Sequence, residues 1–233
     1  MQIAGLQEFT TVDYPGQLAA TIFTLGCNFR CPFCHNPDIV NASRYHLDQL
    51  MPEENFWQFL RERKGKLDGI CITGGEPTLQ PDLLDFMGKI KDMGFLVKLD
   101  SNGTNPSVLK RACQRKLVDY LAMDIKNAPQ HYAETVGLPQ INLSNIQQSV
   151  RLIMESGVDY EFRTTVVPGF HDGGKMEGLG KFIEGAKKFF VQGFRPDVTL
   201  DQKLRGEARF SGQQLQEFKK ILDKYIEKVE IRP

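Results

Sequence analysis

Short apolar runs alternate with amphipathic segments along most of this 233-residue chain. Runs rich in β-branched and aromatic residues predict strands, whereas apolar residues that recur every three or four positions predict helices. We expect six strands, at residues 18–25, 69–73, 95–100, 118–125, 160–167 and 190–196. We expect helices near residues 52–64, 81–93, 106–116, 144–156, 175–188 and 211–226.

This alternation of strands and helices predicts the fold class. Strand–helix units joined by short linkers build parallel sheets with right-handed crossovers. Six units are fewer than the eight that close a barrel, so we expect an α/β fold with an open partial (β/α)6 barrel of parallel strands. Because no repeat or linker-like stretch divides the chain, we expect one domain over residues 1–233. Its parts would be a core at about 18–200, an N-terminal extension at 1–17, and a C-terminal helix and strand at about 211–231.

Composition and charge limit the possible binding partners and the cellular location. Lys plus Arg number 29 and Asp plus Glu also number 29, so no net charge draws the chain towards nucleic acid or an anionic membrane. No apolar stretch approaches the roughly 20 residues of a membrane helix, and the first residues do not resemble a secretion signal. The five cysteines are odd in number and three are clustered, which does not suit a disulfide framework. We therefore expect a cytoplasmic protein with neither a nucleic-acid nor a membrane partner.

Polar and glycine-rich motifs follow successive predicted strands. "CNFRCPFCHN" follows the first strand, "GGEP" the second and "DSNG" the third, while "DIK" closes the fourth and Arg163 lies on the fifth. Ligands of parallel α/β sheets bind at the carboxyl ends of the strands. The motifs therefore predict one ligand site at this rim of the sheet.

The first motif holds three cysteines within eight positions: Cys27, Cys31 and Cys34. One interpretation adds His35 and completes a four-ligand zinc site. The other is a [4Fe–4S] cluster whose fourth iron has no protein ligand and stays open to a small molecule, as catalytic metal sites keep one position open. Cys71 lies in a predicted buried strand and Cys113 on a predicted helix, so we expect both to be core thiols.

The spacing C-x3-C-x2-C after the first strand, with "TGGEP" after the second, resembles the signature of radical S-adenosylmethionine enzymes. The resemblance runs from "TTVDYPG" to "FRPDVTLD" and implies that the partial barrel is of the radical SAM type. More narrowly, "VDYPG" and "CPFCHNPD" resemble the glycyl-radical-enzyme activases. The form "DYPG", where formate-lyase activases tend to have "DGPG", is most similar to the activating proteins of anaerobic ribonucleoside-triphosphate reductases.

The resemblance implies the cofactors and their ligands. It implies one [4Fe–4S] cluster held by Cys27, Cys31 and Cys34, with S-adenosyl-L-methionine on the open iron and no catalytic side chain beyond the cluster. Only about fifteen residues separate the first motif from the next predicted helix, so no second set of cluster cysteines is expected. The residues implied to bind S-adenosylmethionine are Phe33, His35, Gly74, Gly75, Glu76, Asp100, Ser101, Asn102, Asp124, Ile125, Lys126 and Arg163.

The chemistry of several of these residues suits parts of the ligand. Gly74 and Gly75 let the backbone approach closely, and Glu76 or nearby carbonyls can accept hydrogen bonds from the amino group. Phe33 would pack against the cluster or the adenine. His35 would orient the loop or contact the adenine rather than bind iron, because iron ligation would close the open position.

The charged residues have both a ligand-binding and a structural interpretation. Aspartate carboxylates such as Asp100 can accept from ribose hydroxyls, and Lys126 can pair with the ligand's carboxylate. Asp124 and Lys126 face the same side of a strand, but they could equally form a surface ion pair of little energetic value. Asp100 could serve as a turn residue. Arg163 suits a carboxylate through its bidentate fork, or could extend to solvent.

One departure from the formate-lyase activases concerns a late histidine. Those proteins carry a histidine near the end of the core that contacts S-adenosylmethionine, but here no histidine follows His171. Either Gln192 or Asp197 would replace that contact, or the contact is absent. This departure argues against a close formate-lyase assignment.

The resemblance implies reductive cleavage of S-adenosylmethionine and formation of a glycyl radical on a partner enzyme. The expected partner is an anaerobic ribonucleotide reductase, with flavodoxin or ferredoxin as the electron donor. An open barrel would leave a lateral mouth through which a glycine loop reaches the cofactor. Three alternatives stay open: an activase of another glycyl-radical enzyme of the pyruvate formate-lyase type, a radical SAM enzyme acting on a small molecule such as a 7-carboxy-7-deazaguanine synthase, and a non-catalytic zinc-binding module.

Overall fold

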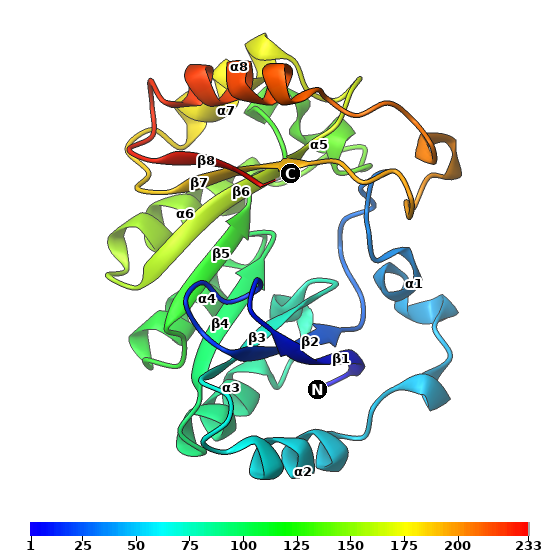
Figure 1. Ribbon diagram of the computed structural model, residues 1–233, viewed down its shortest axis with the longest axis vertical. Coiled ribbons are helices and arrows are strands. Elements are labelled where there is room, and N and C mark those ends of the chain that lie inside the picture. Colours follow the sequence, from blue (N-terminus) through cyan, green and yellow to red (C-terminus); the bar gives the residue numbers. More distant parts are fainter. Residues whose placement is uncertain (233) are drawn as a thin grey trace.

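The computed structural model describes residues 1–232 of the chain (Figure 1). Its centre is one eight-stranded sheet in which the strands are neighbours in the order of the sequence. The strands are β1 (Ile3–Thr10), β2 (Ala19–Thr24), β3 (Gly69–Gly74), β4 (Leu96–Ser101), β5 (Tyr120–Asp124), β6 (Asp159–Val166), β7 (Phe189–Gly193) and β8 (Val229–Arg232). β1 pairs antiparallel with β2, and all later pairs are parallel. The sheet is open, with β1 and β8 at its edges.

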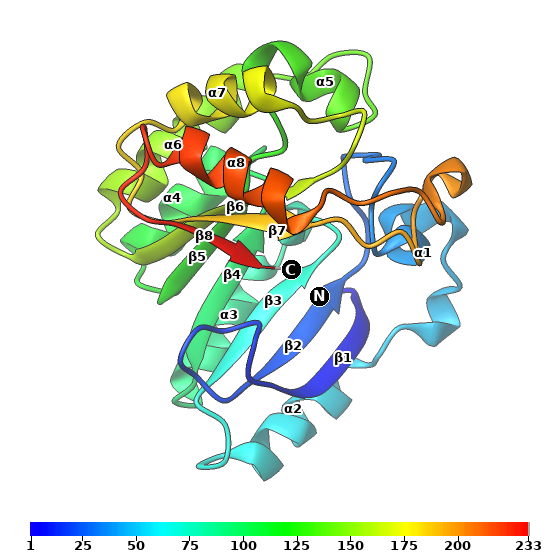
Figure 2. The same ribbon diagram turned by 45° about the horizontal axis from the view of Figure 1, so that its top comes forward.

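Helices connect the strands and cover the outer face of the curved sheet (Figures 1 and 2). The α-helices are α1 (Pro37–Val40), α2 (Glu53–Arg63), α3 (Leu83–Asp92), α4 (Pro106–Gln114), α5 (Tyr132–Thr135), α6 (Leu143–Glu155), α7 (Gly173–Phe182) and α8 (Gly212–Leu222). Short 3-10 helices are η1 (Ala42–Arg44), η2 (Leu47–Gln49), η3 (Pro77–Leu79), η4 (Pro129–His131) and η5 (Gln202–Leu204). Local sequence sets several helix starts. Ser211 and Gln214, for example, form a capping box at the start of α8.

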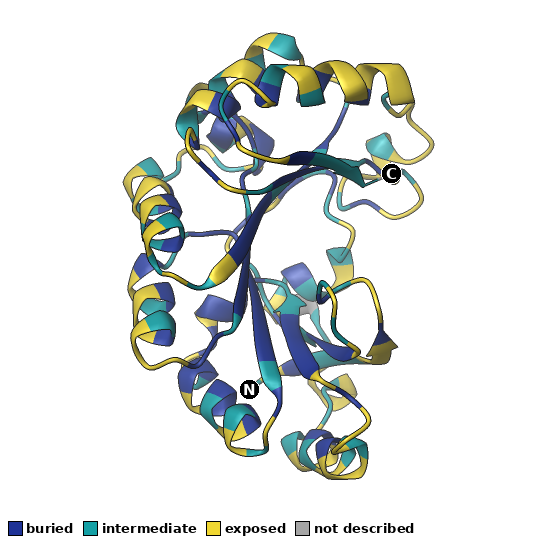
Figure 3. Cartoon of the chain, turned by 60° about the vertical axis from the view of Figure 1, so that its left-hand side comes forward, coloured by how far each residue is buried: buried dark blue, intermediate teal, exposed yellow. Residues whose placement is uncertain are grey.

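The two faces of the sheet differ in chemistry because side chains along a strand alternate between them. On β3, Ile70 and Ile72 join the apolar core beneath the helices, whereas Cys71 and Thr73 line a cavity on the opposite face. Figure 3 shows the strands largely buried and the helices buried on one side only. Parallel strands are usually apolar on both faces. The polar concave face is therefore the natural place to look for function.

The predicted fold class is confirmed, because the sheet is parallel from β2 to β8 and does not close. The six predicted strands correspond to β2–β7, and the predicted C-terminal strand corresponds to β8. The N-terminal extension was not assigned a strand, yet its residues 3–10 form β1. Most of β1 is partly or fully exposed, so it lacks the apolar pattern of the inner strands. Its pairing with β2 also contains two register shifts.

Among the residues that the structure describes, no helix combines the length and the apolar composition needed to cross a lipid bilayer.

Substitution of Phe162, in the middle of β6, tests the assigned apolar core, because none of the surface of Phe162 is exposed. Phe162→Ala is expected to lower the free energy of unfolding by about 3–5 kcal/mol, since it removes a buried ring and leaves a cavity. Phe9→Ala is the matched control, because Phe9 is 56% exposed and its loss should change that free energy by less than about 0.5 kcal/mol. Anaerobic chemical denaturation measures both values. Equal losses in the two variants would contradict the assigned core.

Candidate active site

A cavity of about 380 Å³ lies at the carboxyl ends of the parallel strands. Every residue expected in the site lines this cavity except Ile125. Ile125 is fully buried, and its side chain alternates away from those of Asp124 and Lys126. Its backbone N–H instead donates to the Arg163 carbonyl at 2.9 Å. The Ile125 side chain therefore does not face the cavity, and binding of the ligand by Ile125 stays a prediction.

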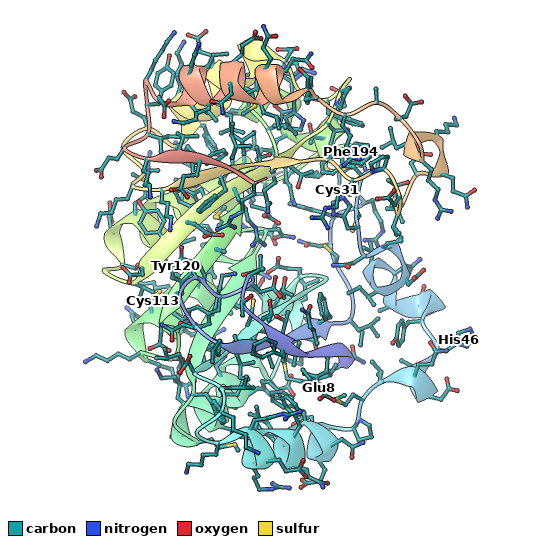
Figure 4. All side chains as sticks on the ribbon, viewed as in Figure 1. Glu8, Cys31, His46, Cys113, Tyr120 and Phe194 are labelled. Atoms are coloured by element: carbon teal, nitrogen blue, oxygen red, sulfur yellow. The ribbon has the colours of Figure 1, made fainter. Side chains whose placement is uncertain are left out.

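The loop between β2 and α1 carries three thiols that line one wall of the cavity, those of Cys27, Cys31 and Cys34. Backbone hydrogen bonds hold this loop at both ends. The Gly26 N–H donates to the Ile39 carbonyl at 2.7 Å, and the Arg30 N–H donates to the Val136 carbonyl at 2.8 Å. Figure 4 shows Cys31 on this loop, far from Cys113 on the outer helix α4. The fold therefore brings the three thiols to one cavity without help from the other cysteines.

Burial disfavours the ionised form of all three thiols. Burial raises the pKa of Cys27 to about 12 and that of Cys31 to about 11. Burial also raises the pKa of Cys34. Thiolates at these positions therefore need a cationic partner. The Phe29 N–H donates to the Cys27 sulfur at 3.3 Å, as donors do around cluster sulfurs. The donor set fits an iron–sulfur cluster with three protein ligands.

The zinc alternative requires a fourth ligand beside the cysteines. The His35 ring instead stacks on Phe194, with ring centroids 6.4 Å apart and planes at 21°. Across residues 1–232 no three His, Cys, Asp or Glu side chains are arranged to hold a single metal ion. The four-ligand zinc site therefore has no preformed ligand set in the described chain.

The two glycines at the end of β3 are needed because β2 packs directly on Gly74 and the loop that carries the cysteines packs directly on Gly75. A Cβ at Gly74 would lie 2.3 Å from the Thr24 nitrogen, and Gly74 has a φ of +112°. A Cβ at Gly75 would lie 1.9 Å from the Gly26 carbonyl oxygen. Side chains at these positions would push the ends of β2 and β3 apart. The glycines thus serve the packing of the loop as well as any approach of a ligand.

Glu76 connects the end of β3 to the end of β4. Its carboxylate is buried and accepts from the Ser101 hydroxyl at 2.8 Å and the Asn102 N–H at 2.6 Å. It also accepts from the hydroxyl and the N–H of Thr78. A carboxylate offers about four acceptor positions, so most of its capacity is used within the protein. A ligand amino group would therefore find free acceptors among the nearby backbone carbonyls rather than on the Glu76 side chain.

Ionised side chains on β4 and β6 and at the end of β5 form a charged wall of the cavity. Arg163 donates from Nε to Asp124 at 2.6 Å and from Nη2 to Asp100 at 2.8 Å. Lys126 donates to the other oxygen of Asp124 at 3.0 Å. Arg163 was expected either to bind a ligand carboxylate or to extend to solvent. Its guanidinium is instead held by two protein carboxylates.

These contacts keep the wall charged. Burial acts to raise the pKa of Asp124, but Arg163 and Lys126 together hold it well below its usual range. Burial acts to lower the pKa of Lys126, but the Asp124 carboxylate and the Cys31 thiol raise it above its usual range. Asp124 and Lys126 do form an ion pair, but it is not a surface pair, because both side chains are largely shielded from solvent.

Lys98 is a functional candidate that the sequence analysis missed. It is 1% exposed and pairs with Asp100 on the same face of β4. Its Nζ lies 3.7 Å from the Cys71 sulfur, which borders the cavity although the thiol is fully buried. The available signal was a lysine two residues before Asp100 in an apolar run, since this spacing puts both on one side of a strand. Asp100 is thus a buried ion-pair residue and not a turn residue.

The late histidine has no counterpart in the cavity wall, but Gln192 on β7 lines the cavity and Asp197 does not. His171 is 3% exposed and lies behind the wall. Its Nδ1 accepts from the Val167 N–H at 3.1 Å, which leaves Nε2 to donate to the Lys126 carbonyl at 2.9 Å. Burial lowers the pKa of His171 to about 4. The neutral ring therefore holds the backbone at Lys126.

Further residues that line the cavity were not among the expected ligand-binding residues. They are Gln7, Asp13, Thr21, Phe23, Phe29, Asn36, Val40, Cys71, Thr73 and Thr165. Alternation along the strands would have indicated that Thr21, Thr73 and Thr165 line the cavity. Each faces the same side of its strand as another lining residue two positions away. Gln7 was not accessible to this reasoning, because β1 was not predicted. Asp13 belongs to the "VDYPG" motif, which was used only for the family resemblance.

Comparisons with known proteins match most of the chain to related proteins. The family model described as the Radical SAM superfamily matches residues 21–177. A Methanocaldococcus jannaschii protein whose name assigns it to the glycyl-radical enzyme activating enzymes is 34% identical over 236 residues, which cover 99% of this chain and 95% of the relative. The pyruvate formate-lyase-activating enzyme of Clostridium pasteurianum is 26% identical and covers 98% of each chain. That of Staphylococcus aureus is 30% identical over 80% of this chain and 78% of its own.

Solved structures share the fold at low sequence identity. Streptococcus suis SuiB bound to the precursor peptide SuiA matches with a TM-score of 0.67 and 14% identity, over 90% of this chain and 47% of that chain. Coproporphyrinogen III oxidase (HemN) of Escherichia coli, a radical SAM enzyme, matches with a TM-score of 0.59 and 14% identity, over 90% of this chain and 52% of that chain. The chain thus spans about half the length of these two structures.

Gly75 tests the contact between the cysteine loop and β3. Gly75→Ala is expected to lower the free energy of unfolding by about 1–3 kcal/mol and to reduce the iron bound per chain, because the new methyl group collides with the Gly26 carbonyl. Chemical denaturation and iron analysis after anaerobic reconstitution measure the two effects. Gly88→Ala on α3 is the control, because its Cβ would meet only Leu117 at 3.8 Å and alanine favours helices. Matching behaviour of the two variants would refute the packing argument.

Proposed function

Because the chain belongs to the radical SAM superfamily and to its glycyl-radical enzyme activating enzymes, we propose that it forms a glycyl radical on an anaerobic ribonucleoside-triphosphate reductase. The observation that carries the proposal is the convergence of three thiols on a cavity that charged side chains also line. This arrangement supports a site that holds both an iron–sulfur cluster and a zwitterionic ligand.

Cys27, Cys31 and Cys34 would hold one [4Fe–4S] cluster and leave its fourth iron open to S-adenosylmethionine. The chemistry that such a cluster supplies when bound is one electron for breaking the C5′–S bond of S-adenosylmethionine, which yields methionine and a 5′-deoxyadenosyl radical that takes a hydrogen atom from a glycine Cα. Flavodoxin or ferredoxin would deliver the electron. All five cysteines are free thiols, which suits the reducing cytoplasm proposed as the site of action.

The residues of the cavity would bind and orient S-adenosylmethionine. Lys126 carries a positive charge into the cavity and would pair with the ligand's carboxylate. Asp100 and Asp124 present carboxylates that suit ribose hydroxyls. Phe33 packs edge-on against Phe170, with centroids 5.6 Å apart, and would offer an apolar surface to the adenine. Gln192 would supply the contact that the late histidine makes in formate-lyase activases.

The "DYPG" loop supports the reductase as the partner. Tyr14 is 3% exposed and packs on Tyr120, with ring centroids 6.0 Å apart. A Cβ at Gly69 would lie 2.9 Å from the Tyr14 ring, so the ring fills the space that this glycine leaves. A glycine in place of Tyr14, as in the "DGPG" form, would leave that space empty. The packing of this loop therefore depends on the tyrosine ring, which the "DGPG" form of the formate-lyase activases lacks.

The same hairpin borders the open side of the sheet. Asp13 lines the cavity and accepts from the Thr21 hydroxyl at 2.7 Å. Phe9, Val12 and Leu18 of this hairpin are exposed apolar residues. A glycine-bearing loop of a partner enzyme would enter here, between β1 and β8, where the sheet is not closed.

Electron paramagnetic resonance distinguishes the reductase from pyruvate formate-lyase, the second candidate favoured by the relatives at 26% and 30% identity. The cluster-loaded protein is reduced and incubated with S-adenosylmethionine and one of the two enzymes. A glycyl-radical doublet is expected with the anaerobic ribonucleotide reductase and not with pyruvate formate-lyase. The reverse pattern would reassign the partner, and silence with both enzymes would reject the proposed function.

Cys31 and Cys113 provide a matched pair for the proposed cluster. Cys31→Ala is expected to abolish cleavage of S-adenosylmethionine to 5′-deoxyadenosine, because it removes one of three thiolates. Cys113→Ala is expected to retain cleavage, because Cys113 lies on α4 and is not among the described residues that line the cavity. Chromatography of the products after anaerobic reduction measures both. Loss of cleavage in both variants, or in neither, would contradict the assignment.

A further inference from the structure

A second group of charged side chains lies on the concave face next to the cavity wall. Glu161 on β6 has no exposed surface, and Arg232 on β8 donates to both of its carboxylate oxygens at 2.8 and 2.9 Å. The Tyr120 hydroxyl donates to the same carboxylate at 3.0 Å. None of these three is among the described residues that line the cavity. Any influence on the site must therefore pass through another residue.

Arg163 connects this group to the site. Its Nη1 lies 4.0 Å from the Glu161 carboxylate, while its Nε and Nη2 donate to Asp124 and Asp100. Three carboxylates thus surround one guanidinium, but only two of them are within hydrogen-bond distance. The third, Glu161, is near enough to compete for Arg163 if it lost its other partner.

Each of these carboxylates contacts a second cation. The pairs are Asp100 with Lys98, Asp124 with Lys126, and Glu161 with Arg232. Each carboxylate therefore has a cationic partner in addition to Arg163. Removal of Arg232 would leave Glu161 as the one carboxylate of the three with no cation except Arg163.

A buried carboxylate without a cation is costly. Glu161 would reduce this cost by drawing Arg163 across the 4.0 Å gap. The guanidinium is planar and rigid, so a turn towards Glu161 would loosen its contacts with Asp124 and Asp100. The two carboxylates on the cavity wall would then lose their common anchor.

We propose that Arg232 is a positioning residue, which binds Glu161 and thereby leaves Arg163 to hold Asp124 and Asp100 on the cavity wall. The inference rests on the proposed function, because it assigns those two carboxylates to the binding of S-adenosylmethionine. It adds that the last strand of the sheet, which touches no ligand, sets the geometry of the site through two intervening side chains.

The test measures the dissociation constant of S-adenosylmethionine by anaerobic equilibrium dialysis with cluster-loaded protein. Arg232→Met is expected to weaken binding about tenfold, within the range of couplings between contacting residues. Addition of Glu161→Gln removes the competing charge, so the double variant is expected to return to within about threefold of wild type. Lys228→Met removes an exposed ion pair with Glu230 beside the same strand and should leave binding unchanged.

Two further measurements separate positioning from a general effect on stability. Arg232→Lys keeps the cation and is expected to bind like wild type. The electron paramagnetic resonance spectrum of the reduced cluster with S-adenosylmethionine should change in Arg232→Met and return in the double variant. If Arg232→Met does not fold, Arg232→Gln replaces it, alone and together with Glu161→Gln.

The outcomes separate this inference from the proposed function. Rescue of binding by Glu161→Gln supports the inference, because a merely structural role for Arg232 predicts no rescue. A double variant that binds as weakly as the single variant overturns it, and so does a single variant that binds like wild type. In both of these cases normal binding by the wild type leaves the proposed function standing. A wild-type protein that binds no S-adenosylmethionine would overturn the proposed function itself, and this inference with it.

Discussion

The contact of Arg163 with Asp124 and Asp100 joins three neighbouring strands at the cavity, and the concave face of the sheet is arranged around it. Burial of two carboxylates is unfavourable unless cations accompany them. Lys98 provides one of these cations from the same strand as Asp100, and Lys126 provides the other from two residues beyond Asp124. This side of the sheet is consequently rich in polar groups. The main apolar core lies on the side that the helices cover, and a small apolar cluster of Tyr14, Ala19 and Tyr120 lies on the concave side.

The sulfur-bearing wall and the charged wall are connected through Glu76. Its backbone N–H donates to the Gly26 carbonyl in the cysteine loop, and its carboxylate accepts from Ser101 and Asn102 after β4. The glycines that precede it allow the loop to sit against the end of β3. The distance between the thiols and the carboxylates is therefore set by short, buried contacts within the protein. A ligand that must contact both walls would meet a site with little freedom to rearrange.

The sequence predicted those parts of the site that depend on position along a single strand. The spacing of "DIK" correctly placed Asp124 and Lys126 on the same side of the chain at the end of β5, and the order of motifs correctly brought them to the same cavity as the cysteines. The partners of Arg163 and Glu76 could not be predicted in the same way. They depend on which residues lie opposite each other on neighbouring strands, and this pairing is known only once the strands are in place.

Two omissions have similar physical causes. β1 was not predicted because an exposed edge strand needs no alternation of apolar and polar residues. Lys98 was not predicted as a site residue, because the sequence alone does not show which groups a lysine in an apolar run will contact. Cys71 was expected in the core and is fully buried, yet it also borders the cavity, because the concave face of the sheet is itself both interior and functional.

The open sheet leaves two edges whose backbone groups could pair with another chain, and the two edges differ from an ideal strand in different ways. β1 is interrupted by two register shifts, and β8 is only four residues long and bears Glu230 and Arg232. Irregular, short and charged edges are poor templates for strand addition. The sheet can therefore stay open without exposing the protein to edge-to-edge aggregation, a hazard that a closed barrel avoids by having no edges.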